Sequence, residues 1–94
     1  MNIRRLILDA GKGLNKPTLI VLSEAMVSVK GVEGVNISVI EIDIETMGMN
    51  VTIEGSNIDF EEIIRKIENS GAVVHSVDEV AVGSRLVENI RREN

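Results

Sequence analysis

The chain of 94 residues has no cysteine, tryptophan or tyrosine, and its only aromatic residue is Phe60. Without cysteine it can form no disulfide, iron-sulfur cluster, thiolate zinc site or cysteine nucleophile. With one aromatic ring it lacks the stacking platforms that bind single-stranded nucleic acid. No apolar run approaches the roughly 20 residues of a membrane span, and residues 1–9 contain no signal-peptide core. We therefore expect a cytoplasmic protein with neither nucleic acid nor a membrane as a partner.

Basic residues are scarce in the middle of the chain. The net charge is -5, and residues 31–64 contain eight carboxylates but no lysine or arginine. Neutralising phosphates requires clustered basic side chains, so a polyanionic partner is disfavoured. The segregation of charge indicates either electrostatic complementarity between neighbouring subunits or a solvated acidic face.

The expected order of elements is strand, helix, strand, strand, helix, strand. Apolar periodicity and turn residues predict strands at 3–9, 35–46, 49–55 and 72–82, and helices at 17–30 and 59–70. This is the split βαβ pattern of a ferredoxin-like α+β sandwich, with an antiparallel sheet of order 4-1-3-2 and two helices on one face. Ser84 is expected to cap a short C-terminal helix (84–92), in which Glu88 and Arg92 pair. We expect one domain over residues 1–94.

The two main predicted helices differ in their patterns. Asp59 and Glu62 form a capping box at the start of the second, between the hydrophobic staple residues Ile58 and Ile63. The first is apolar on nearly all sides, which is typical of a helix covered on more than one side. A small monomer cannot easily cover it, so we expect the first helix to take part in self-association.

Two of the predicted strands change the phase of their apolar residues. In residues 35–46 the alternation inverts between Val39 and Ile40, and in residues 72–82 it inverts at Asp78-Glu79. A one-residue inversion predicts a bulge or a change of buried face. Both strands are edges of the predicted sheet, so the bulges either protect those edges or mark a surface that meets a different edge of the next copy. Such a heterologous contact can close into a ring.

A hairpin register follows from placing apolar residues opposite one another. It pairs Ile44 with Met49, Ile42 with Val51 and Ile40 with Ile53, and it leaves residues 45–48 as the connection.

This register predicts an oxygen-rich patch on the outer face of the hairpin, which contains Glu41, Asp43, Asn50, Thr52 and Glu54. The candidate cation ligands in it are Glu41, Asp43 and Asn50. Oxygen ligands select Ca²⁺ or Mg²⁺. A flat strand face offers ligands from one side only, so water or a neighbouring subunit would complete the shell. The alternative is a solvated strand face.

His75 is the only histidine, so no nucleophilic triad or all-histidine zinc site can form. If the first and fourth strands are antiparallel neighbours, Asp9 lies near His75, and the two form a structural or pH-sensitive pair. The alternative is an ordinary strand or interface histidine. The segment Gly11-Lys12-Gly13 is interpreted as a break after the first strand, either an anion cradle or a flexible connection.

Four segments together resemble an archaeal family classed as domain of unknown function 211. They are GVEGVNISVIEID (31–43), VTIEG (51–55), IDFEEI (58–63) and VHSVDEV (74–80). The resemblance implies a ferredoxin-like fold and a ring-shaped homo-oligomer, with no assigned activity. The chain departs from the family's Leu-Lys-Pro-His-like segment at residues 10–17.

Three hypotheses of function follow. The first is a non-enzymatic, ring-forming homo-oligomer that assembles through its edge strands and first helix and binds a small ligand or divalent cation at subunit interfaces. The second is a scaffold module that binds another protein. The third is a metal-dependent hydrolase using Glu41, Asp43 and His75, which the predicted register keeps apart within one subunit.

Overall fold

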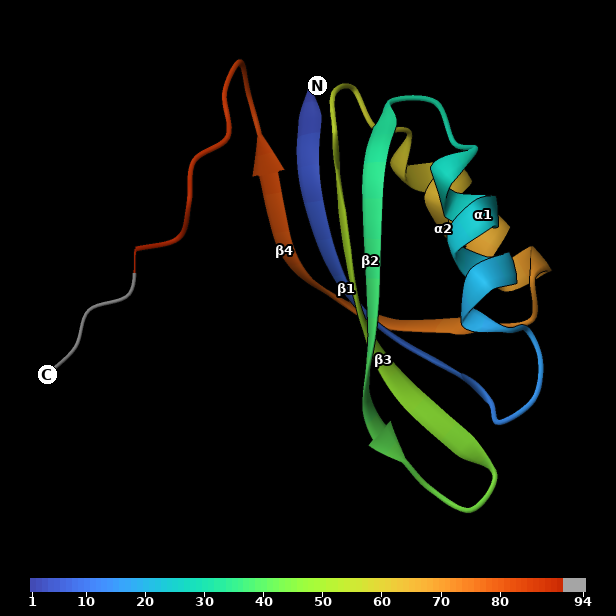
Figure 1. The fold of residues 1–94 in the computed structure, drawn as a ribbon. Coiled ribbons are helices and arrows are strands. Elements are labelled where there is room, and N and C mark those ends of the chain that lie inside the picture. The colour runs from blue at the N-terminus through green and yellow to red at the C-terminus, as the bar shows by residue number, and fades with distance from the viewer. Residues whose placement is uncertain (91–94) are drawn as a thin grey trace, which may run out of the picture.

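The computed structural model describes residues 1–90, which form a four-stranded sheet with two helices on one face (Figure 1). The elements are β1 (Ile3–Gly13), α1 (Leu19–Val27), β2 (Val32–Ile42), β3 (Thr46–Gly55), α2 (Phe60–Asn69) and β4 (Val73–Val82). The sheet order is β2-β3-β1-β4 and every pairing is antiparallel. The predicted ferredoxin-like βαββαβ fold is confirmed.

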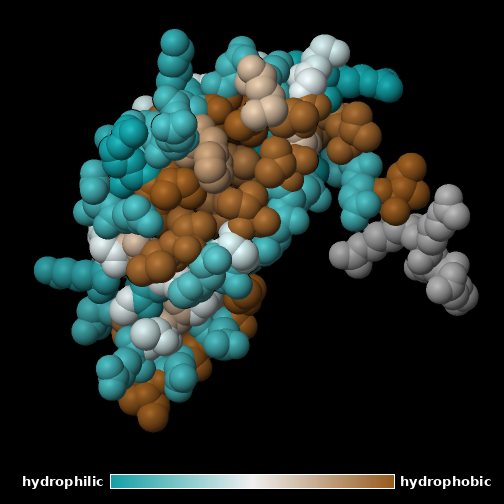
Figure 2. Space-filling view, turned by 180° about the vertical axis from the view of Figure 1, so that it is seen from behind, coloured by the Kyte–Doolittle hydropathy of each residue, from teal (hydrophilic) through white to brown (hydrophobic). Residues whose placement is uncertain are grey.

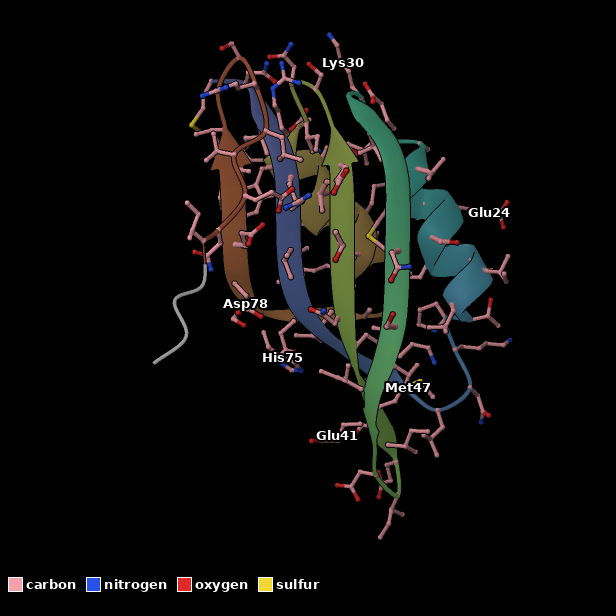
Figure 3. All side chains as sticks on the ribbon, turned by 60° about the vertical axis from the view of Figure 1, so that its left-hand side comes forward. Glu24, Lys30, Glu41, Met47, His75 and Asp78 are labelled. Carbon is pink, nitrogen blue, oxygen red and sulfur yellow. The ribbon has the colours of Figure 1, made fainter. Side chains whose placement is uncertain are left out.

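The hydrophobic core lies between the helices and one face of the sheet. Alternate residues of β1 and β3 are buried there, among them Leu6, Leu8, Val51 and Ile53. The inward stripes of the two helices complete it with Leu22, Met26, Ile63 and Ile67. The opposite face of the sheet carries no helix, and Figure 3 looks onto it.

Both helices begin at side-chain caps. The Thr18 hydroxyl accepts a hydrogen bond from the backbone N–H of Val21, and the Asp59 carboxylate accepts one from Glu62 at 3.2 Å. Ile58 and Ile63 are both buried, as the predicted staple requires. No helix in residues 1–90 is long and apolar enough to cross a membrane.

β1 is four residues longer than predicted. The expectation that Gly11 ends this strand is wrong, because residues 11–13 continue the ladder opposite Gly48, Met47 and Thr46 of β3. Glycine weakens a strand through backbone entropy, but here the pairing partner supplies the hydrogen bonds that hold it. The segment interpreted as a loop is therefore part of the sheet, and the connection to α1 begins at Leu14.

The predicted hairpin register is also wrong. The structure pairs Val35 with Ile53, Ile37 with Val51 and Val39 with Met49, and the connection is residues 43–45. Val35, Ile37 and Val39 alternate in one phase and Ile40, Ile42 and Ile44 in the other. Both sets are apolar, so two hairpin registers place apolar residues opposite one another. The helices cover the part of the hairpin that contains the first phase, and that phase is the one packed on the core.

Bulges lie at both predicted phase inversions. The β2–β3 register shifts between Val39 and Glu41, which makes Ile40 an extra residue. The β1–β4 register shifts between Glu79 and Val77, and again between Ser76 and Val74, which makes Asp78 and His75 extra residues. Beyond its bulge β2 continues with β3 as an arm that extends past the helices (Figure 1).

The predicted C-terminal helix is absent from residues 84–90, which have no regular secondary structure. The Arg4 guanidinium donates to the carbonyl oxygens of Gly83 at 2.7 Å and Ser84 at 2.6 Å, and Glu88 accepts hydrogen bonds from Arg5. These contacts to β1 compete with helical hydrogen bonding in the segment. Arg91 and Arg92, the last residues of the predicted helix, lie outside the described residues.

Candidate functional site

A cavity of about 440 Å³ opens on the helix-free side of the sheet, where β1 ends and β3 begins. Its floor is formed by β1 and β3 around Gly11 and Gly48. One wall consists of Ile40 and Glu41 of β2, and the other includes His75 of β4. A volume of this size suits a small organic molecule rather than a bare metal ion.

Two glycines clear the floor of the cavity. Gly11 and Gly48 are Cα partners across the β1–β3 pair, so neither strand places a side chain there. A Cβ on Gly11 would lie 2.6 Å from Nε2 of His75, which means that the imidazole lies directly against the β1 backbone. A Cβ on Gly48 would lie 3.6 Å from Cβ of Glu41. The absence of a side chain at Gly11 makes room for the imidazole of His75, and its absence at Gly48 leaves the floor beside Glu41 open.

Two bulges supply the walls. Ile40 is the extra residue of the β2 bulge, and both Ile40 and Glu41 lie close to Gly48. His75 is the extra residue of a β4 bulge and lies over Gly11. Figure 3 shows Glu41 and His75 coming from the two outer strands on the helix-free side. Bulges redirect side chains in this way because the added residue changes the alternation locally.

The charge in the cavity is negative. Asp9 and Glu41 both line it, and neither forms a salt bridge within residues 1–90. Lys12 is also among the lining residues, but it is only 6% exposed and its ammonium donates to the carbonyl oxygen of Gly13 at 2.7 Å. Its donors are therefore directed at the backbone of the β1–α1 connection.

At the other end of β1, Arg5 lies among three carboxylates. Its guanidinium contacts Glu88 at 2.7 Å, Glu54 at 2.8 Å and Glu79 at 3.4 Å, and its side chain is 13% exposed. The hydrogen bonds that Arg5 donates to Glu88 lower the pKa of Glu88, and those it donates to Glu88 and Glu54 raise its own pKa. This cluster fastens residues 84–90 to the sheet.

The predicted cation patch is dispersed. Asn50 pairs with Ser38 and Asp9, not with Asp43, because the hairpin register differs from the predicted one. Asp43 accepts a hydrogen bond from the backbone N–H of Ile44 at 2.7 Å within the hairpin connection. Of the three predicted ligands only Glu41 lines the cavity. Within residues 1–90 no three His, Asp or Glu side chains are close enough together to hold a metal ion.

Asp9 and His75 do line the same cavity, but Asp9 is the Cα partner of Ser76, and among residues 1–90 no side-chain hydrogen bond joins Asp9 to His75. Glu41 and His75 line opposite walls of this cavity and Asp43 does not line it, so the described residues of one subunit do not gather the three groups of the hydrolase hypothesis, as expected. Sequence reasoning missed Gly11, Gly48 and Ile40. Gly11 could have indicated the cavity if its cross-strand partner had been known, because that partner is also a glycine, Gly48.

Comparison with known proteins finds relatives along nearly the whole chain. The model of the DUF211 family, described as uncharacterized ArCR, matches residues 4–94. A protein of Methanocaldococcus jannaschii, itself described as uncharacterized, is 44% identical over 89 residues, which cover 95% of this chain and 91% of the relative. The chain is thus similar in sequence to archaeal proteins whose descriptions assign no activity.

Proposed function

Because the chain belongs to the uncharacterized ArCR family, whose description names no reaction, we propose from its surfaces that it is a non-enzymatic, ring-forming homo-oligomer that binds a small ligand or divalent cation and acts in the cytoplasm. The observation that carries this proposal is the exposure of apolar side chains on both outer strands. Neither nucleic acid nor a membrane is among the proposed partners, in keeping with the net charge of -5.

The first apolar surface is the hairpin arm. Beyond the bulge Ile42 is 68% exposed and Ile44 is 86% exposed, on a part of the hairpin that the helices do not reach. Each large aliphatic side chain left in water forgoes about 1.5–3 kcal/mol of burial free energy. The exposed isoleucines of the arm are therefore suited to burial against an apolar surface of another copy.

The second apolar surface lies on β4. Val77 and Val80 pair with the core residues Leu8 and Leu6, but they are 41% and 51% exposed because the helices cover the other strands more fully. Phe60 and Ile64 of α2 are half-buried and line a shallow groove on that helix. Figure 2 views the molecule from the side of β4 and shows a continuous apolar patch there. A patch of this kind marks an interaction site in soluble proteins.

The arm and the β4 surface belong to opposite edges of the sheet. If the arm of one copy meets the β4 surface of the next, the contact is heterologous and closes into a ring when the rotation allows. The exposed residues Ile20, Val21 and Val27 of α1 offer a further surface for neighbouring copies. The hydrolase alternative is disfavoured by the hydrogen bond that engages Asp43 within its own hairpin connection.

The test uses complementation between two variants. Ile42→Glu disables the arm and Val80→Glu disables the β4 surface, so each alone is expected to be a monomer by native mass spectrometry. An equimolar mixture retains one intact contact, between the arm of the Val80 variant and the β4 surface of the Ile42 variant, and should form a heterodimer. Leu14→Glu, in the β1–α1 connection, is the matched control and should assemble like the unchanged protein.

Two results would overturn the proposal. An unchanged protein that is monomeric at micromolar concentration excludes self-assembly and leaves the apolar surfaces for a different protein. Variants that assemble normally would place the contact elsewhere. Circular dichroism of each variant confirms that loss of assembly is not loss of folding.

A further inference from the structure

The charges of the residues that line the cavity between the two bulges indicate which class of ligand it binds. Asp9 and Glu41 provide negative charge without a basic partner in residues 1–90, and the nearest ammonium, that of Lys12, donates to backbone carbonyls. Asp9 is half-buried and Glu41 is exposed, and two carboxylates that line one cavity attract a cationic guest. The ligand should therefore carry positive charge.

The two carboxylates lie at separate points of the cavity. Asp9 is on β1 and pairs with Asn50, whereas Glu41 is on β2 and pairs with Gly48, so β3 lies between them and they are displaced by two residues along it. Strand spacing and rise per residue place their Cα atoms roughly 12 Å apart. At that separation the two ends of a linear molecule can each reach one of the carboxylates.

The surface between the carboxylates crosses β3 at Gly48, which contributes no side chain, and Ile40 of the β2 bulge adds aliphatic surface beside it. The imidazole of His75 meets Gly11 edge-on, with its Nε2 pointing at the position where a Cβ would lie. A polymethylene chain fits such a channel because it needs width and apolar contact but no hydrogen bonds.

We propose that this cavity binds a linear aliphatic di- or polyamine, with one ammonium group at Asp9, another at Glu41, and the methylene chain over Gly48 beside His75. A metal ion is disfavoured on the same observations, since no three His, Asp or Glu side chains in residues 1–90 are close enough to hold one. The proposal deepens the ligand-binding part of the proposed function and rests on it, but it does not depend on assembly, because every group comes from one chain.

Isothermal titration calorimetry at low ionic strength tests this with spermidine, putrescine and butylamine. We expect one spermidine per chain, weaker binding of the shorter putrescine, and at least tenfold weaker binding of the monoamine. Asp9→Asn and Glu41→Gln should each reduce spermidine affinity roughly tenfold, which corresponds to the loss of about 1.4 kcal/mol. Glu33→Gln is the matched control, because Glu33 is an exposed carboxylate at the other register shift of β2, away from the cavity. It should leave the affinity unchanged.

Several outcomes would overturn the proposal: equal affinities for butylamine and spermidine, binding that survives both carboxylate substitutions, or an equal loss in the Glu33 control. Displacement of spermidine by Ca²⁺ at equimolar concentration would also overturn it, in favour of a cation site. Native mass spectra of the same samples separate the two proposals. Assembly without spermidine binding rejects only the amine site, whereas spermidine binding to a monomer rejects only the assembly.

Discussion

The helix-free face of the sheet has two acidic ends that are handled differently. Near the start of β1, Glu54, Glu79 and Glu88 gather around the guanidinium of Arg5. Near its end, Asp9 and Glu41 line a cavity and form no salt bridge in the described part of the chain. The end at Arg5 has its positive charge within the chain and is covered by residues 84–90. The end at Asp9 and Glu41 has an open cavity with no such charge from the described residues between the two carboxylates.

The difference follows from side-chain size at equivalent positions of one strand. Arg5 and Gly11 both lie on the helix-free face of β1 and both have partners on β3 and β4. A long guanidinium side chain reaches carboxylates on either side and fills the surface between them. Gly11 has no side chain, so the imidazole of His75 lies against β1 there, and the surface next to it over Gly48 stays open as a cavity. At one end of β1 the side chain of Arg5 supplies the positive charge between the carboxylates. At the other end no basic side chain of residues 1–90 lies between Asp9 and Glu41, and a cavity takes its place.

Removing the internal cation should have the largest effect. Arg5→Gln leaves three carboxylates close together without a counter-charge, and we expect the thermal unfolding midpoint to fall by several degrees at low salt. Added salt should recover part of this loss, because it screens the repulsion among the carboxylates. Circular dichroism melts measure both effects. Arg5→Lys is the control, since it keeps the charge but loses the planar guanidinium. Its unfolding midpoint should lie between those of the unchanged protein and Arg5→Gln. A midpoint unchanged by Arg5→Gln would show that the cluster does not stabilise the fold.

Supplying a cation at the other end should make the two ends alike. Asn50 is the Cα partner of Asp9, so Asn50→Arg places a guanidinium opposite that carboxylate. A cross-strand ion pair contributes about 0.5 kcal/mol, which a urea unfolding curve resolves. The same substitution should weaken spermidine binding roughly tenfold by occupying Asp9. Asn50→Gln, which is uncharged, should change neither quantity, and an equal effect of both substitutions would point to a steric cause.

Acid should loosen the closed end with a smaller effect. The pKa of Glu88 is lowered by its hydrogen bonds from Arg5, so the contact is present at neutral pH and is lost as the pH falls through that lowered pKa. The amide resonances of residues 84–90 should then move toward random-coil positions in NMR spectra, while those of the central strands stay in place. The change in global stability should be slight, because Glu88 is largely exposed. In Glu88→Gln the segment should already be released at neutral pH, and a retained acid transition would assign it to another group.

Part of the fold could be predicted because its signals are local. The start of α2 was specified by Asp59, Ile58 and Ile63, which lie within six consecutive residues and act without help from the rest of the chain. The bulge at Val39-Ile40 was visible as a change of phase within a single strand. Residues 84–92 misled the prediction because their capping residue and charge pattern are weak local signals, and contacts of Arg4 and Arg5 with this segment prevail over them.

The candidate site could be predicted only in fragments. Glu41, Asp9 and His75 were recognised as residues with chemistry, but they were assigned to two separate sites. Their grouping depends on the hairpin register, and both apolar phases of β2 satisfied the rule that was used to choose it. Gly11 was interpreted as the end of a strand because its partner Gly48 lies far away in sequence.

The sequence by itself determined the order of elements, the caps of α2, the positions of the phase inversions and the acidity of the middle of the chain, because each of these rests on neighbours a few residues apart. The tertiary structure decided which phase of β2 is buried, that residues 11–13 remain in the sheet, and that two bulges face one another across a glycine floor. Those outcomes depend on where the helices cover the sheet and on which strands pair, and both are contacts between residues distant along the chain.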